Sequence, residues 1–84
     1  MKVGVKLFAS LTASLPVEAR ASHRLDLEVE EGTTVLDLIR RLGISESQCA
    51  LVLVDGVWVA QGGLRARVLR DGEVLAIWPP VAGG

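Results

Sequence analysis

The residues best suited to chemistry stand together in the segment Pro79-Pro80-Val81-Ala82-Gly83-Gly84. Glycine lacks a Cβ atom, so Gly83 and Gly84 form the narrowest peptide that a chain can present. A free carboxylate on Gly84 could therefore enter a tunnel that excludes side chains. Because a carboxylate reacts poorly with nucleophiles, it would need activation, and the general route is adenylation by ATP. The pattern predicts a thin, reactive tip with Gly84 as the modified residue.

The two prolines predict a stiff arm between this tip and the folded part of the chain. Proline fixes φ and removes an N–H donor, so a strand should end near Trp78 and continue as extended chain. From Pro79 to the last glycine, extended chain spans up to ~20 Å, which could reach a buried active site in a partner. We expect a folded domain over residues 1–78 and an arm over residues 79–84. The alternative is an ordinary frayed end whose glycines have no role.

An acyl-adenylate on Gly84 could react in two ways, and the residues leave both open. A sulfur donor would displace AMP and leave a thiocarboxylate, which the arm could carry to a second enzyme. A thiol followed by a lysine amine would instead give a protein conjugate. Both reactions require a narrow tip that an enzyme can reach.

No other set of catalytic residues stands out in the sequence. The single histidine, His23, has no nucleophile in a recognisable arrangement and is expected to be exposed in a loop. Cys49 cannot form an internal disulfide and is expected to be buried. No Cys and His cluster has metal-ligand spacing, and no glycine loop has a phosphate-binding pattern. We therefore expect no active site, bound cofactor or metal site of the chain's own.

Composition restricts the classes of partner. The 84 residues have a net charge of −1 and are 50% hydrophobic, which predicts one small domain with an adequate core. Lys6 interrupts the first apolar run, so we expect no signal peptide or membrane span and a cytoplasmic protein. Balanced charge argues against a nucleic-acid surface. The arginines at 65, 67 and 70 are expected to form a solvated edge, or else a docking patch for an acidic partner.

Hydrophobic periodicity and turn residues predict the elements that position the arm. Alternation indicates strands near residues 3–7 and 25–29, paired antiparallel, and a final strand over residues 74–78. A capping box at Thr34 predicts a helix over residues 34–43. Asp55-Gly56 predicts a hairpin between residues 51–54 and 57–60. Together they predict an α+β domain in two layers, with a mixed sheet of four or five strands crossed by one main helix.

The two tryptophans receive different expectations. In the last strand, Leu75 and Ile77 share one face, so Trp78 falls on the other. If the first pair faces the helix, Trp78 lies on the open face beside the arm, where it would serve as an interface anchor. Phe8, at the end of a neighbouring strand, is expected to join that patch. Trp58 is expected in the core.

Several of these motifs resemble the MoaD/ThiS family of ubiquitin-like sulfur carriers, and within it the small subunits of molybdopterin synthase. The strongest likeness is Asp71-Gly72-Glu73-Val74 leading through a strand into the Pro-Pro and Gly-Gly tail. Leu7-Phe8-Ala9 and Gly32-Thr33-Thr34-Val35 fall where the family places them. The resemblance implies a ubiquitin-like β-grasp fold.

The resemblance also implies a function and partners. Gly84 would be adenylated by an adenylyltransferase related to ubiquitin-activating enzymes, which consumes the ATP, and a sulfur donor protein would supply the thiocarboxylate sulfur. Residues 79–84, with Trp78 and Phe8, would bind the large subunit of molybdopterin synthase, where sulfur passes to cyclic pyranopterin monophosphate. Two small subunits would flank a dimer of large ones. The chain would then be a non-catalytic subunit and sulfur donor.

Some features depart from the family pattern. Pro16 shortens the helix that usually follows the first strand, Asp55 replaces a frequent asparagine, and Ile77-Trp78 replaces an aromatic pair. The Pro-Pro pair favours molybdopterin synthesis over thiamine synthesis. The alternatives are a carrier for thiamine or cysteine synthesis, a relative linked to tungsten enzymes, a ubiquitin-like protein modifier, and an interaction module whose tail is incidental.

Overall fold

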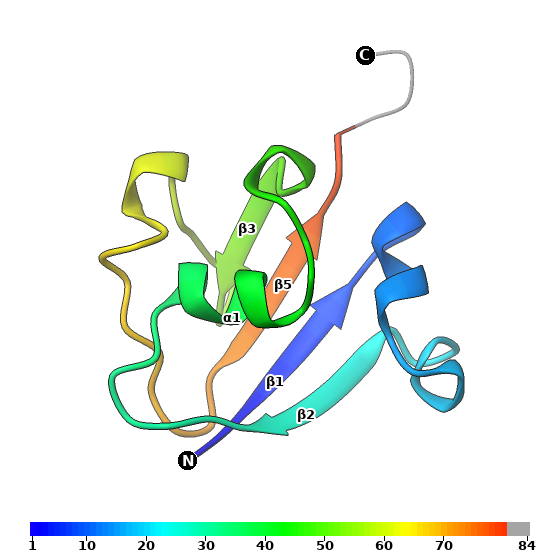
Figure 1. Ribbon diagram of the computed structural model, residues 1–84, viewed down its shortest axis with the longest axis horizontal. Coiled ribbons are helices and arrows are strands. Elements are labelled where there is room, and N and C mark those ends of the chain that lie inside the picture. The colour runs from blue at the N-terminus through cyan, green and yellow to red at the C-terminus, as the bar shows by residue number, and fades with distance from the viewer. Residues whose placement is uncertain (81–84) are drawn as a thin grey trace.

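A computed structural model describes residues 1–80 as a sheet with one α-helix packed on it (Figure 1). The chain order of its elements is β1 (Lys2–Leu7), η1 (Ala9–Ser14), η2 (Val17–Ala19), β2 (Arg24–Glu28), α1 (Val35–Arg41), η3 (Glu46–Gln48), β3 (Leu51–Val54), β4 (Val57–Trp58), η4 (Gln61–Gly63) and β5 (Val74–Trp78), where η denotes a short 3-10 helix. The mixed sheet and its helix confirm the predicted α+β class. No helix of residues 1–80 has both the length and the apolar character needed to cross a membrane.

The sheet has five strands in the order β2-β1-β5-β3-β4. β1 and β5 pair in parallel at its centre, with Leu7 beside Ile77. β2 pairs antiparallel with β1, as predicted, and β3 pairs antiparallel with β5. Since β1 and β5 point the same way, Phe8 and the residues after Trp78 leave the sheet at the same end.

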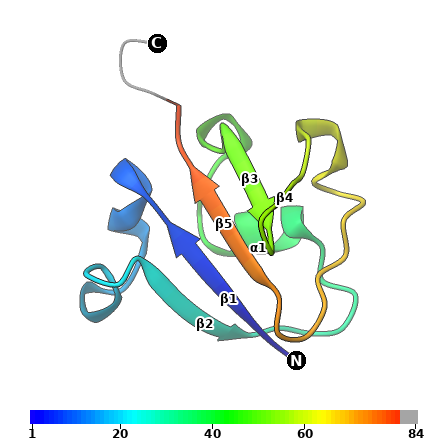
Figure 2. The same cartoon turned by 180° about the vertical axis from the view of Figure 1, so that it is seen from behind.

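One face of the sheet is buried beneath α1 and the loops, and the other is open (Figures 1 and 2). Strand residues alternate between the faces, so Val5, Leu75 and Val54 point into the core and are almost fully buried. The core consists of Val3, Val5, Leu7, Leu11, Leu15, Ala19, Val29, Val35, Leu36, Leu38, Ile39, Ile44, Cys49, Val52, Val54, Leu64, Leu69, Leu75 and Ile77. The burial of Cys49 confirms the expectation for that residue.

The helix begins and ends at the predicted signals. Thr34 is its N-cap: the Thr34 Oγ1 accepts from the Asp37 N–H at 3.1 Å, and the Asp37 carboxylate accepts from the Thr34 N–H at 3.0 Å. The hydrogen bond from the Thr34 backbone is the main cause that holds the pKa of Asp37 below its ordinary value, and the Thr34 side chain adds to it. At the other end Gly43 has φ +75°, which glycine adopts without strain.

The hairpin forms at Asp55-Gly56, but its second strand is shorter than predicted. Positive φ angles of 49° and 81° at these two residues match a type I′ turn. β4 ends at Trp58 rather than at residue 60, because the chain turns away into η4. The expectation that Trp58 is a core residue is wrong: it lies opposite Leu53 on the open face and is 65% exposed. The reason is that α1 covers only the other face.

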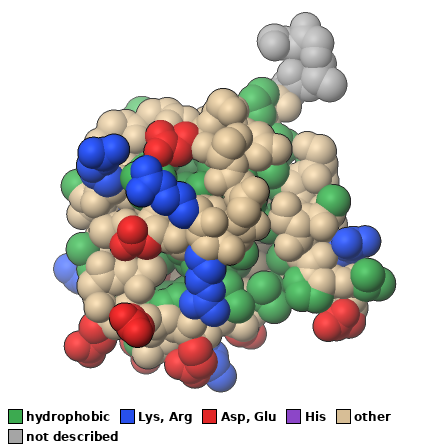
Figure 3. All heavy atoms as spheres, viewed as in Figure 1, with side chains coloured by type: hydrophobic (Ala, Val, Ile, Leu, Met, Phe, Trp, Pro, Cys, Tyr) green, Lys and Arg blue, Asp and Glu red, His purple; other side chains and the backbone are tan. Residues whose placement is uncertain are grey.

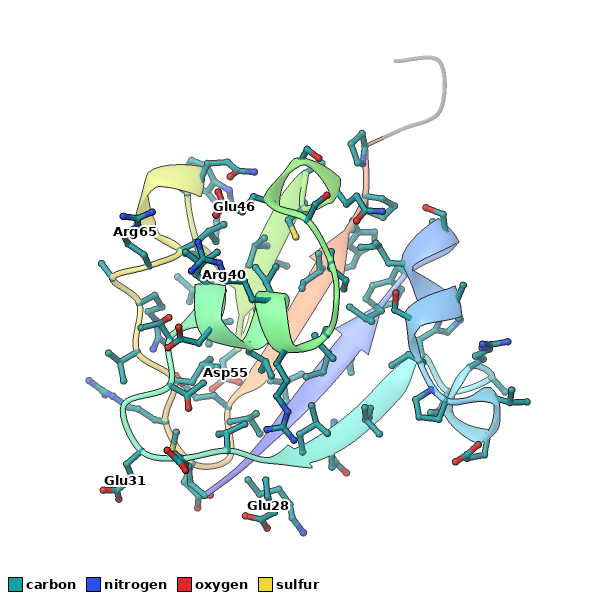
Figure 4. All side chains as sticks on the ribbon, in the orientation of Figure 1. Glu28, Glu31, Arg40, Glu46, Asp55 and Arg65 are labelled. Carbon is teal, nitrogen blue, oxygen red and sulfur yellow. The ribbon has the colours of Figure 1, made fainter. Side chains whose placement is uncertain are left out.

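The helix-bearing surface carries charges of both signs (Figure 3). Arg40 pairs with Glu46 at 3.9 Å, and Arg65 lies exposed nearby (Figure 4). In the predicted arginine edge, Arg67 instead binds Glu73 through two hydrogen bonds of 3.2 and 2.6 Å. The side-chain bond from Arg67 is the main cause that lowers the pKa of Glu73. This pair therefore fixes the residue immediately before β5 to Arg67, six positions earlier in the chain.

Candidate functional site

Apolar side chains gather on the open face of the sheet beside the end of β5. Register sets its rows: Leu51 lies beside Trp78, and Leu53 lies between Trp58 and Ala76. Phe8 completes it from the end of β1. We call these six residues, Phe8, Leu51, Leu53, Trp58, Ala76 and Trp78, the open-face patch.

Phe8 and Trp78 form the tightest contact of this patch. Their ring centroids are 4.3 Å apart and their planes differ by 6°, so the two rings are stacked. The backbone holds this geometry from both sides. The Phe8 N–H donates to the Ile77 carbonyl at 3.3 Å, and the Trp78 carbonyl accepts from the Ala50 N–H at 2.9 Å. The prediction that Phe8 and Trp78 share one surface at the base of the arm is confirmed.

His23 extends the stack at its far end. Its ring lies 5.4 Å from Phe8 with a 19° angle between the planes, and its Nδ1 lies 3.3 Å from the Leu7 carbonyl oxygen. Thr12 Oγ1 is 3.4 Å from the same nitrogen. His23 lies in a turn, as expected, but it is half-buried, so the expectation that it is exposed is wrong. Its ring stacks on Phe8, which follows β1, whereas His23 itself immediately precedes β2.

A shallow hollow of about 470 Å³ lies within the patch. It is lined by Lys6, Phe8, Leu53, Asp55, Gly56, Val74, Ala76 and Trp78. Asp55 is engaged there, because its Oδ1 accepts from the Val74 N–H at 2.8 Å. The hollow is thus mostly apolar, with Lys6 as its basic group. Such a surface is suited to binding an apolar group of a partner protein.

The predicted arm residues divide between described and undescribed parts of the chain. Pro79 follows Trp78 directly and is half-buried, whereas Pro80 is exposed. The predictions for Val81, Ala82, Gly83 and Gly84 concern residues outside the described part of the chain. Within residues 1–80, no group of three or more His, Cys, Asp or Glu could hold a metal ion. The nucleophile Cys49 is buried, and this burial, aided by Glu46, raises the pKa of its thiol.

Comparison with known proteins agrees with this geometry. Residues 5–84 match the ThiS family. Among solved structures, SAMP1 of Haloferax volcanii, a small archaeal modifier protein, is 26% identical with a TM-score of 0.65, and the match covers 100% of both chains. A putative molybdopterin converting factor subunit 1 of Pyrococcus furiosus is 26% identical with a TM-score of 0.67, covering 96% of this chain and 99% of that one. No curated protein matches.

A third neighbour shows the fold alone. Subunit 1 of the molybdopterin-converting factor from Helicobacter pylori, solved in complex with subunit 2, is 20% identical with a TM-score of 0.61, and the match covers 100% of both chains. The chain belongs to the ThiS family, and so to the ubiquitin-like sulfur carriers that also include MoaD. Its sheet and helix form the ubiquitin-like β-grasp fold of these neighbours.

Sequence reasoning missed five residues of the candidate site, namely Lys6, Leu51, Leu53, Trp58 and Ala76. A usable signal was present for two of them. The two-residue turn at 55–56 fixes the pairing of Leu53 with Trp58, and a run that is apolar on both faces predicts an apolar open face when one helix covers only one side. For Lys6 the sequence predicts only a position on one face of a strand. Its place in the site depends on which strands pair on either side of β1, and local sequence does not indicate that pairing.

Proposed function

We propose that this chain is a sulfur carrier in which Gly84 is adenylated and converted to a thiocarboxylate, and that it acts as the small subunit of molybdopterin synthase. The observation that carries the proposal is the position of the Phe8–Trp78 stack. It lies at the end of β5, immediately before the Pro-Pro pair. A partner that binds the open-face patch would therefore receive the arm at the edge of the contact.

The chemistry assigns separate roles to the chain and its partners. In the adenylating partner, a carboxylate oxygen of Gly84 attacks the α-phosphate of ATP and pyrophosphate leaves. A donor that supplies sulfur at the sulfide level then attacks the acyl carbon and displaces AMP, which leaves a thiocarboxylate on Gly84. The chain's own residues bind and orient: the open-face patch docks, and Pro79 and Pro80 direct the tip while limiting the entropy lost on docking. In the large subunit, the thiocarboxylate sulfur passes to cyclic pyranopterin monophosphate.

Two lines favour molybdopterin synthesis among the carrier pathways. The Pyrococcus furiosus neighbour bears the description of a molybdopterin converting factor subunit and aligns over nearly its full length. The Helicobacter pylori neighbour, which shares the fold, was solved with a second subunit of that factor. We propose a large synthase subunit as the partner of the open-face patch on this basis, and the Pro79-Pro80 pair agrees with the same branch.

Protein modification is the second candidate. It is favoured by the Haloferax volcanii neighbour, a small archaeal modifier protein that aligns with the whole chain. Both candidates begin with adenylation of Gly84 and use the same surface for the adenylating partner. They differ after that step. In protein modification an enzyme thiol would displace AMP to give a thioester, and a lysine amine of a target protein would then displace that thiol and form an isopeptide bond.

Intact mass spectrometry tests the proposal. The chain is incubated with its adenylating enzyme, ATP and a sulfur source. Replacement of oxygen by sulfur should add about 16 Da, and the product should then convert cyclic pyranopterin monophosphate when the large subunit is added. The control is a variant lacking Gly84, which should gain no mass. Conjugation to a lysine without any thiocarboxylate product would favour the modifier, and activity of the truncated variant would refute both.

A further inference from the structure

Lys6 occupies the centre of the open face. On β1 it lies between Ala76 of β5 and Arg24 of β2 in the sheet register. Its side chain is half-buried and lines the same hollow as Phe8 and Trp78. Any partner that covers the open-face patch would therefore also cover the Lys6 ammonium group.

The strand arrangement leaves this ammonium group beside a like charge. Arg24 directly opposite is itself engaged, because its Nε donates to Asp26 Oδ1 at 3.1 Å. The Arg24 guanidinium group lies over Gly4, where a Cβ atom would be only 2.7 Å from the Arg24 Nη2. The arginine thus leans along β2 towards the acid. Gly4 is what allows this conformation, since any larger side chain would fill the space.

The acid nearest to the hollow is also engaged. Asp55 accepts a hydrogen bond from the Val74 N–H. Among residues 1–80, Lys6 makes no side-chain hydrogen bond or ion pair that meets ordinary distance criteria. Lys2 lies on the same strand and face but outside this hollow, and the register places Glu28 opposite it. The hollow beside the open-face patch is therefore lined by a cation, Lys6, for which a partner protein could supply the counter-charge.

We infer that the open-face patch docks on an apolar protein surface that carries a carboxylate facing Lys6. A buried cation is unfavourable unless it is paired. An apolar partner without such an acid would remove water from the ammonium group without replacing its interactions, which would weaken binding. Complementary charge also gives orientation and discrimination between partners. This inference rests on the proposed function and deepens it for the adenylating enzyme, which is the partner that both candidate functions share at this surface.

The test compares two lysines on one strand. Binding of the full chain to its adenylating enzyme is measured by calorimetry for the parent, Lys6→Met, Lys6→Arg and Lys2→Met. Methionine keeps most of the side-chain volume, so Lys6→Met should fold, which circular dichroism checks. It should bind at least about thirtyfold more weakly, because the partner's acid is left unpaired, whereas Lys2→Met should bind within about twofold of the parent. Lys6→Arg should recover most of the affinity.

Salt and the parent chain separate the possible failures. Parent affinity should fall as salt rises, and that of Lys6→Met should fall less. Equal or tighter binding by Lys6→Met refutes the partner carboxylate while leaving the carrier function intact. If Lys6→Met does not fold, the partner carboxylate is refuted by two results together. Lys6→Arg would lose affinity, and the affinity of the parent chain would not change with salt concentration. A parent chain that neither binds nor is adenylated refutes the proposed function itself, and the inference with it.

Discussion

Trp58 and Trp78 both point to the open face, yet their surroundings differ. Trp78 stacks on Phe8 and is half-buried, whereas Trp58 stands at the margin of the patch with most of its ring exposed. Residue type alone cannot separate them, since aromatic residues in small domains are usually buried. What separates them is strand register, together with a single helix that leaves one face uncovered. Trp58 should therefore contribute little to folding and more to binding.

Substitution on the two faces should have very different effects on stability. Trp58→Ser removes an exposed ring and should change the free energy of unfolding by less than about 0.5 kcal/mol. Leu75→Ala creates a cavity under α1 and should cost about 2 to 5 kcal/mol. Urea denaturation followed by circular dichroism measures both. Comparable losses in the two variants would mean that Trp58 packs into the core after all.

The Arg67–Glu73 pair gives the domain an acid-sensitive contact. The pKa of Glu73 is lower in the folded protein than its ordinary value of 4.5, so the unfolded state binds more protons in acid. The stabilisation is present above about pH 4.5 and is lost as pH falls through the lowered pKa of the folded state. Glu73→Gln should flatten stability measured between about pH 5 and 3. An unchanged slope in Glu73→Gln would contradict the assignment.

At the scale of elements, α1 is a seven-residue helix and depends on its ends. Helices this short are marginal by propensity alone, so the capping box at Thr34 and the apolar stripe against the sheet must hold it. The helix was readable from sequence because its signals are local: a capping residue, an acid three positions later and a glycine after the last turn. The end of β4 was not readable, because nothing local marks the departure of the chain after Trp58.

Removing the cap should weaken the whole domain. Thr34→Ala leaves the Asp37 N–H without its side-chain acceptor and should cost about 1 kcal/mol in the free energy of unfolding. Thr34→Ser keeps a hydroxyl at the same place and should stay within a few tenths of a kcal/mol of the parent. Thermal denaturation at neutral pH compares them. Equal melting temperatures for the two variants would show that packing alone positions the helix.

At the scale of the whole molecule, the central strands of the sheet and its edge strand β4 differ in strand pairing and in burial. β1 and β5 are paired on both sides and buried beneath α1. β4 is a two-residue edge strand. Sequence patterns predicted the β-grasp elements and the surface shared by Phe8 and Trp78. Sequence patterns did not predict that Lys6 lies in the hollow beside a like charge. That property depends on Arg24 and Asp55, which come near Lys6 only through the pairing of strands distant in sequence.

Hydrogen exchange should follow this division. Amides of β1 and β5 should exchange slowest, with protection approaching that of global unfolding, while those of β4 and η4 should exchange through local opening. Two-dimensional NMR of the amides measures both sets in one experiment. Fast exchange in β5 would imply that the strand leading into the arm opens independently of the core.

The parallel pairing of β1 with β5 has a practical consequence for handling the protein. Both strands start at the same end of the sheet, so Met1 lies at the end opposite to the one where Pro79 follows β5 (Figure 1). The Met1 nitrogen donates to the Val29 carbonyl at 3.0 Å, a bond that a peptide N–H can also make. A fluorophore, affinity handle or surface linker attached before Met1 would therefore lie away from Pro79 and from the Phe8–Trp78 stack.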